Sequence, residues 1–300
     1  VLKLPPARIR KSCIDNLVSG CPNLREFEIN TFPMDKCSSV VTLEHLKSFK
    51  NDAYTETTNE INSGSHFIRN LASQCSNLEH LDTPNLKFNE RDLVFIVNHM
   101  KGRLKSWSVL IHDNIVEMFG ELISQCIEIE KLYIKGGRTN IDFIQHLQKL
   151  KVLEIHKCFF PPRLSDATNI PSKKFPMNLQ SLDIRDCRLS EQVVALLSEF
   201  VSELKFLILE RVSHMSSESL QILLSKCDSL SHFEASSLNG CITDESLSCL
   251  FSKPSLEVLE LLDCDGLSPE FEIRFRDQNP HVKFKFTASV VQDLGFFLYD

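Results

Sequence analysis

The stretch Cys227–Leu250, CDSLSHFEASSLNGCITDESLSCL, decides the fold, because the same unit recurs before and after it at a nearly constant interval. It begins with a Cys-x-x-Leu step and a short alternating apolar run, which predicts a strand. A second cysteine with Ile-Thr-Asp follows at Cys241–Asp244, and Leu247 and Leu250 have helical spacing. One such unit cannot bury its apolar edge alone, so we expect a copy to stack on either side.

The motif Leu-x-x-Leu-x-Leu marks the strand of each copy. Its first residues are Leu24, Leu43, Leu78, Leu104, Ile129, Leu150, Leu179, Leu204, Leu230 and Leu256. From Leu78 onward the steps range from 21 residues, between Ile129 and Leu150, to 29 residues, between Leu150 and Leu179. This is the period of leucine-rich repeats, in which each copy supplies a short strand and a helix or helical turn.

The spacing predicts two layers around one core. The fourth and sixth motif positions, such as Leu153 and Ile155, point to the same side of a strand and are expected to line the core. Between strands, apolar residues at helical spacing predict helices that cover the other side of the core. The clearest stripes are Ile115, Met118, Phe119, Leu122, Ile123 and Val193, Val194, Leu196, Leu197, Phe200. Ser268-Pro269-Glu270 predicts a capped helix N-terminus.

The predicted fold class is therefore an α/β leucine-rich-repeat solenoid. Strands lie about 4.8 Å apart and packed helices about 8–10 Å apart, so the stack curves, with parallel strands on the concave face and helices on the convex face. We predict a single domain over residues 1–300 with about ten to eleven repeats. Insertions near 52–65 and 159–176 are expected to be passive surface loops, and a C-terminal cap is expected near 287–300.

The cysteines follow the repeat. Cysteine stands three residues before the first motif position at Cys21, Cys75, Cys126 and Cys227, and eight residues after it at Cys158, Cys187 and Cys264. This pattern resembles the cysteine-containing leucine-rich repeat, Cys-x-x-Leu-x-x-Leu-x-Leu-x-x-Cys-x-x-Ile-Thr-Asp, best known from F-box/leucine-rich-repeat proteins. The resemblance covers most of the chain. Other residues replace the turn cysteine at His112, Gly137, Val212 and Leu238.

The resemblance implies a function. In that family the turn cysteine, or an asparagine such as Asn51, satisfies backbone groups, and the repeats bind the substrate of a cullin-based ubiquitin ligase. A Skp–cullin ligase core is expected as a partner only if an F-box lies upstream, since none is visible in Val1–Leu24. The alternative is a ligase-independent scaffold or inhibitor. A GTPase-activating role ranks below both, because such activators have longer and more regular repeats.

Composition excludes several classes of function. The formal charge of −7 argues against nucleic acid or an anionic membrane as the main partner. We find no membrane-spanning run, no signal peptide and no Asn-x-Ser/Thr acceptor. Eleven cysteines, an odd number at repeat positions, fit a reducing compartment better than a disulfide framework. We therefore expect an intracellular protein of the cytoplasm or nucleus, and Val1–Leu4 resembles a strand from a longer chain.

No pattern for catalysis or metal binding is present in the sequence. We find no Cys-x-x-Cys pair, His-Glu-x-x-His, phosphate loop, dinucleotide fingerprint or nucleophile elbow. The ten histidines lack ligand spacing. Trp107 occupies an inward strand position and is expected in the core. We predict a protein that is not an enzyme, with no catalytic residue, metal or cofactor.

The outward strand positions are the candidate functional surface. The fifth motif positions are Glu28, Lys47, Asp82, Ser108, Tyr133, Glu154, Asp183, Ile208, Glu234 and Glu260, with Lys285 in the last strand. Any single charged residue there is explained by solubility, but Tyr133, Phe206 and Ile208 are apolar groups among acids, as in a binding hot spot. We predict a protein partner with a basic, partly apolar segment. The proposed contact residues are Tyr133, Glu154, Asp183, Arg185, Phe206, Ile208, Glu234 and Glu260.

Overall fold

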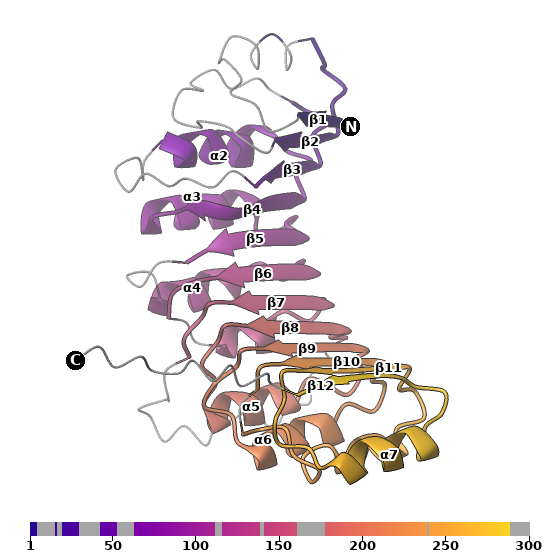
Figure 1. Cartoon of the computed structure of the whole chain (residues 1–300). Coiled ribbons are helices and arrows are strands. Elements are labelled where there is room, and N and C mark those ends of the chain that lie inside the picture. Colours follow the sequence, from indigo (N-terminus) through magenta and orange to yellow (C-terminus); the bar gives the residue numbers. More distant parts are fainter. Residues whose placement is uncertain are drawn as a thin grey trace, which may run out of the picture.

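The computed structural model describes residues 1–4, 16, 20–29, 43–52, 63–111, 116–138, 141–160, 178–238 and 240–288. Within these residues, twelve strands form one sheet in which each strand pairs with the next in chain order (Figure 1). The pairings are parallel. The strands are β1 (Leu2–Leu4), β2 (Glu26–Ile29), β3 (Ser48–Asn51), β4 (His80–Lys87), β5 (Ser106–Leu110), β6 (Lys131–Lys135), β7 (Val152–His156), β8 (Ser181–Arg185), β9 (Phe206–Glu210), β10 (His232–Ser236), β11 (Val258–Leu262) and β12 (Lys283–Thr287).

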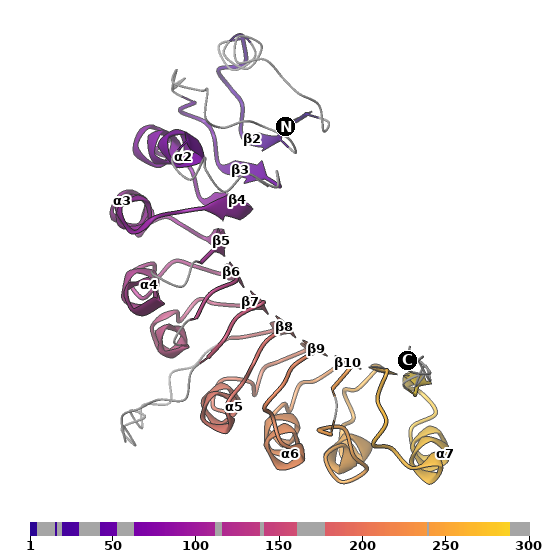
Figure 2. The same cartoon turned by 60° about the vertical axis from the view of Figure 1, so that its left-hand side comes forward.

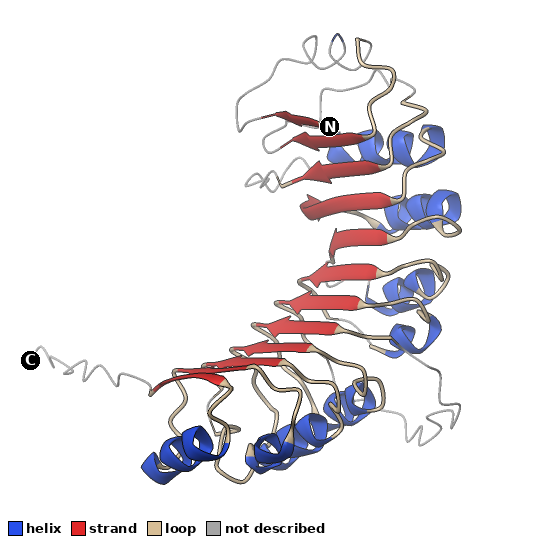
Figure 3. Ribbon diagram, turned by 90° about the vertical axis from the view of Figure 1, so that its right-hand side faces the viewer, coloured by secondary structure: helices blue, strands red, loops and turns tan. Residues whose placement is uncertain are grey.

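Helices lie on one side of this sheet. The described ones are α2 (Ser63–Gln74), α3 (Glu90–Met100), α4 (Val116–Ile123), α5 (Glu191–Ser198), α6 (Ser217–Ser225) and α7 (Pro269–Gln278), with the 3-10 helices η3 (Asp142–His146) and η4 (Ser248–Ser252). The strands form the inner wall of an arc and the helices its outer wall (Figures 2 and 3). The structure confirms the predicted α/β leucine-rich-repeat solenoid, with a concave strand face and a convex helical face.

The core fills the space between the two walls. The inward strand positions, such as Leu153 and Ile155, are fully buried, and so are Phe119 of α4 and Leu197 of α5. Burying one such side chain stabilises the fold by about 1.5–3 kcal/mol. These contacts confirm the predicted alternation of the strands and the predicted helical stripes, apart from Ile115, which lies outside the described residues.

The register of one repeat differs from the prediction. Phe49 pairs with Phe27, and Lys50 pairs with Glu28. The motif of this repeat therefore starts at Leu46, three residues after Leu43, and Lys50 takes the outward position that we assigned to Lys47. Asn51 lies in the sixth, inward position, only 3% exposed, and is not a turn residue. The spacing was ambiguous because both leucines are buried and either one fits the apolar pattern.

The turn cysteines have the role that the resemblance implied. The thiol of Cys187 donates to the carbonyl oxygen of Arg185 at 3.1 Å, and the thiol of Cys264 donates to that of Leu262 at 3.3 Å. The residues just before them, Asp186 and Asp263, have left-handed φ angles of 54° and 53°. The cysteine thus satisfies a strand carbonyl where the chain turns sharply.

The other cysteines have little thiolate character. Burial raises the pKa of Cys126 and of Cys227 to about 12, so both thiols stay protonated at neutral pH. Within the described part of the chain, no two cysteines are joined by a disulfide. These positions therefore serve packing and backbone hydrogen bonding.

Three predicted features, two insertions and a C-terminal cap, lie mostly outside the residues that the structure describes. Most of the insertion near 52–65, most of that near 159–176, and most of the C-terminal cap near 287–300 lie outside the described residues. The start predicted at Ser268-Pro269-Glu270 is confirmed, with Pro269 in the first turn of α7. Among the described helices, none has the length and apolar character needed to cross a membrane.

We expect the N-cap of α7 to contribute measurably to stability. Ser268 Oγ accepts from the backbone N–H of Phe271 at 3.1 Å and donates to Asp244 at 2.6 Å, so Ser268→Ala should lower the free energy of unfolding by about 1–2 kcal/mol. The matched control is Ser190→Ala at the N-cap of α5, where the buried hydroxyl makes no hydrogen bond within the described part of the chain. Urea unfolding followed by circular dichroism measures both. Equal losses in the two variants would contradict this account.

Candidate partner-binding face

The structure places all eight predicted contact residues on the concave face. Along the central column, Tyr133 pairs with Glu154, and Glu154 pairs with Asp183. The column continues through Ile208 and Glu234. Glu260 follows on β11, Arg185 lies two residues after Asp183 on β8, and Phe206 lies two residues before Ile208 on β9. The eight residues thus lie on six consecutive strands, β6 to β11.

Asp183 is already neutralised within the protein. Its two carboxylate oxygens accept from Nε and Nη2 of Arg185 at 2.8 and 2.9 Å, and Arg185 also donates to Glu210 at 2.9 Å. Burial would raise the pKa of Asp183, but the nearby imidazole of His156 and the hydrogen-bonded guanidinium of Arg185 bring this pKa below its ordinary value. At 9% exposed, Asp183 holds Arg185 in place and has little surface left for a partner.

The ends of the column are also paired. At the N-terminal end, Glu28 lies 2.7 Å from the ammonium of Lys3, and Asp82 lies 3.5 Å from that of Lys50. At the other end, Glu260 lies 3.6 Å from the ammonium of Lys285. These exposed pairs add little stability, but they remove free charge from both ends of the column.

Glu154 and Glu234 differ from the other acids of the column. Within the described residues, neither carboxylate has an ion pair or hydrogen bond with another side chain. Burial, and then the neighbouring charge of Asp183, raise the pKa of Glu154 above its ordinary value. Ionised Glu154 therefore carries an electrostatic cost that a cation from outside could remove.

Tyr133 is held beside Glu154 by its neighbour. Its hydroxyl shares a hydrogen bond of 3.3 Å with Nδ1 of His156, and the two rings meet edge to face with centroids 4.9 Å apart. Burial, and then the nearby acids, raise the pKa of Tyr133 to about 12, so the hydroxyl stays protonated at neutral pH. The ring is a fixed apolar wall.

A hollow of about 440 Å³ opens next to this wall. It lies over β5, whose outward residues Ser106 and Ser108 are small, and Tyr133 and Glu154 also line it. Sequence reasoning missed this hollow. The signal was present as two serines at the third and fifth positions of one strand, between strands that carry long side chains there.

Further along the face, β9 presents apolar groups to solvent. Phe206 is 47% exposed, and its ring packs on that of His232 with the two ring centroids 6.0 Å apart. Ile208, two residues later on the same strand, is partly exposed. Exposed aromatic and aliphatic groups of this kind are typical of contact hot spots. The structure thus brings the predicted apolar and acidic residues onto one surface.

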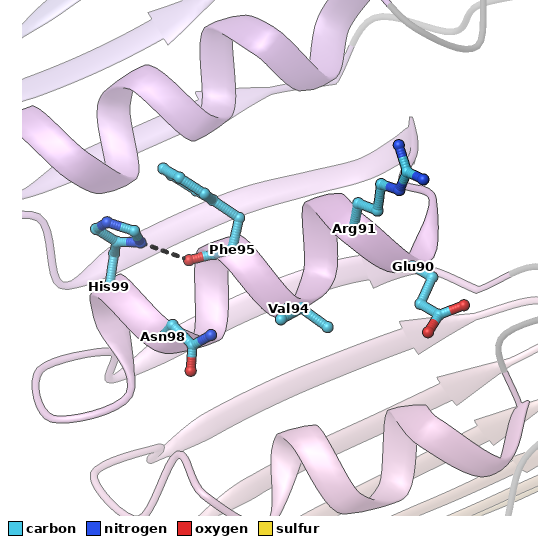
Figure 4. Close-up of a pocket in the computed structure, with 6 residues that line it drawn as sticks. All are labelled: Glu90, Arg91, Val94, Phe95, Asn98 and His99. Carbon is cyan, nitrogen blue, oxygen red and sulfur yellow. Dashed lines mark hydrogen bonds between the residues drawn. The ribbon is translucent and has the colours of Figure 1, made fainter.

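A second hollow, of about 260 Å³, lies on the convex side at α3 (Figure 4). Two of its side chains are already stacked on each other: Phe95 lies on His99 with ring centroids 4.0 Å apart. From outside the hollow, the guanidinium of Arg69 lies 4.6 Å from the centre of the Phe95 ring. In the described part of the chain, no group of three or more His, Cys, Asp or Glu could hold a metal ion. The concave face is therefore the stronger candidate site.

Comparison with solved structures identifies proteins with a similar architecture. TLR13, solved as a TLR13–ssRNA13 complex, superposes with a TM-score of 0.53 at 13% identity over 89% of this chain and 36% of TLR13. The fold is that of leucine-rich-repeat proteins. An internalin (inlF) of Listeria monocytogenes matches with a TM-score of 0.41 at 12% identity, covering 82% of each chain. A leucine-rich-repeat protein of Leptospira interrogans matches with a TM-score of 0.35 at 14% identity, covering 95% of this chain and 93% of that one.

No protein-family model matches this leucine-rich-repeat chain. No curated protein matches it either. The likenesses to solved structures therefore concern the fold, and the function must be argued from the chain's own residues.

We expect Glu154 and Asp183 to affect stability in opposite directions as pH changes. The pKa of Glu154 is higher in the folded state than its ordinary value of 4.5. Ionisation of Glu154 therefore opposes folding as the pH rises from 4.5 through the pKa of the folded state, so Glu154→Gln should raise Tm at pH 7 and not at pH 4.

The pKa of Asp183 is lower in the folded state than its ordinary value of 3.8. Asp183→Asn should therefore lower the free energy of unfolding by about 2 kcal/mol at pH 7, and by less as the pH falls below 3.8. Thermal unfolding across pH measures both, and a lower Tm for Glu154→Gln at pH 7 would contradict this assignment.

Proposed function

We propose that this chain is a recognition domain that binds a protein partner across its concave face. The observation that supports the proposal best is the exposed pair Phe206 and Ile208, which stands among acids of which Glu154 and Glu234 are unpaired within the described residues. Apolar anchors supply binding energy when they are desolvated, and a charged rim supplies specificity.

The charge of the face favours a protein over a nucleic acid. TLR13 was solved with a single-stranded RNA. RNA phosphates require lysine and arginine at the contact surface. In this chain Arg185 is bound by Asp183 and Glu210, and the formal net charge is −7. A polyanion would meet the free carboxylates of Glu154 and Glu234, so RNA does not fit this surface.

We further propose that the domain is the substrate-binding part of an F-box-type adaptor of a cullin-based ubiquitin ligase, acting inside the cell. The support is the recurring cysteine pattern, whose turn residues Cys158, Cys187 and Cys264 are buried and bond to backbone carbonyls. A Skp–cullin core would join through an F-box elsewhere in the gene product. A scaffold or inhibitor role shares the same binding face and differs in lacking that core.

Affinity capture separates these roles. The full-length gene product and this 300-residue domain are each used as bait in cells with the proteasome blocked, and bound proteins are identified by mass spectrometry. Recovery of a Skp-type linker and a cullin with the full-length bait, together with another protein common to both baits, is the expected result. A stable common partner without any ligase core would instead support the scaffold or inhibitor.

The place of binding needs a second measurement. A photo-crosslinking amino acid is introduced at Ser181, on the concave strand β8, or at Glu121, on the convex helix α4. We expect the common partner to crosslink from position 181 and not from position 121. Crosslinking from the convex position alone would overturn the proposed function.

A further inference from the structure

The free charges of the concave column have a definite spacing. Most of its acids are paired within the protein, and among its described residues Glu154 on β7 and Glu234 on β10 are the two unpaired ones. Neighbouring strands lie about 4.8 Å apart, so three strand steps separate these two carboxylates by roughly 14 Å. A partner that neutralises both must present two cations at this separation.

The surface between the two carboxylates combines an internal ion pair on β8 with an apolar patch on β9. Asp183 on β8 is neutralised by Arg185, and Ile208 on β9 pairs with Asp183 on one side and with Glu234 on the other. Phe206 widens this patch on the same strand. An uncharged side chain of the partner is therefore favoured between the two cations.

The space beside Glu154 suits a long side chain. The hollow over Ser106 and Ser108 is also lined by Glu154 and by Tyr133, whose ring is held by His156. An arginine or lysine there could lay its aliphatic stem against the ring and bring its charge to the carboxylate. Lys50 and Lys131 also line the hollow, and Lys50 does not compete for Glu154 because it already faces two carboxylates.

We propose that the partner segment is extended and has the pattern basic-x-apolar-x-basic, with its two cations on Glu154 and Glu234 and its apolar residue on Ile208 and Phe206. Four residues of extended chain span roughly 13–14 Å, which matches the separation of the two carboxylates. This inference rests on the proposed function and specifies the chemistry of the partner at the same face.

Labelled peptides test the pattern directly. The probe is Arg-Ser-Leu-Ser-Arg between neutral flanks, and binding to the purified domain is followed by fluorescence polarisation. We expect alanine in place of either arginine, or serine in place of leucine, to weaken binding about tenfold. A peptide with its arginines two residues apart, and one with glutamate for arginine, should bind at least tenfold more weakly than the probe.

Variants of the domain identify which carboxylate meets which cation. Glu154→Gln and Glu234→Gln should each weaken the probe about tenfold, and each should abolish the effect of removing one arginine while leaving the effect of the other. The matched control is Glu121→Gln on the convex helix α4, which should bind the probe like the unaltered domain. These neutral replacements keep the shape of the side chain, and circular dichroism confirms folding.

The outcomes separate this inference from the proposed function. Failure of the probe to bind, equal binding of the acidic peptide, or unchanged binding by both glutamine variants would overturn the basic-x-apolar-x-basic pattern. If a partner still crosslinks from position 181 in any of these cases, the concave face remains the binding surface and only the pattern is wrong. Loss of that crosslink as well would remove both.

Discussion

Trp107→Ala is expected to lower the free energy of unfolding by about 3–5 kcal/mol, a large part of the stability of an ordinary domain. Trp107 is 1% exposed, and its indole packs on Phe119 with ring centroids 6.3 Å apart. Phe119 in turn meets Phe143 edge to face at 6.1 Å. Removing the indole therefore leaves a cavity at one end of an aromatic cluster that joins two repeats. Urea unfolding followed by far-ultraviolet circular dichroism measures the loss.

The control for this prediction is Trp107→Phe. Nε1 of Trp107 is buried and has no hydrogen-bond partner among the described residues, so phenylalanine removes an unsatisfied donor and keeps most of the packing. We expect a cost of about 1 kcal/mol or less. If Trp107→Ala unfolded at the same urea concentration as the unaltered domain, Trp107 would not be a core residue.

Much of the fold follows from one spacing rule. A residue two places after another on a strand must point the same way, so the motif separates the buried Leu153 and Ile155 from the outward Glu154 without further information. The rule failed where two apolar residues fit equally well, at Leu43 and Leu46. It also could not reveal the longer strand β4 (His80–Lys87), where the pairing with β5 shifts between Asp82 and Lys87. Strand length there depends on contacts with both neighbours.

The sequence predicted which residues lie on the candidate surface, but it did not predict which of its acids lack an ion-pair partner among the described residues. Position alone placed Glu154, Asp183 and Glu234 in one outward column. Whether each acid is free depends on side chains from the same and neighbouring strands, and Arg185 turns back onto Asp183 from only two residues away. The hollow over Ser106 is formed by missing side-chain volume, which a motif alignment does not register.

This difference between the acids predicts different outcomes for charge reversal. Glu154→Lys combined with Glu234→Lys is expected to weaken binding of the captured partner more than a hundredfold, because both free carboxylates would become repulsive to its cations. The domain should remain folded, since neither carboxylate is used by another described side chain. Partner affinity is measured by biolayer interferometry on purified proteins, and folding is checked by thermal unfolding.

Asp183→Lys should act mainly on the fold, and only through the fold on binding. Its carboxylate holds Arg185 by two hydrogen bonds and lies 3.7 Å from Nε2 of His156, so a lysine there would place a third basic group in a mostly buried position. Breaking a buried ion pair in this way costs about 3–5 kcal/mol. If Asp183→Lys kept the Tm of the unaltered domain and lost the partner, Asp183 would be a contact residue.

The double variant Glu154→Lys with Glu234→Lys has its own contrary outcome. If that variant kept the partner, the concave acids would serve solubility alone.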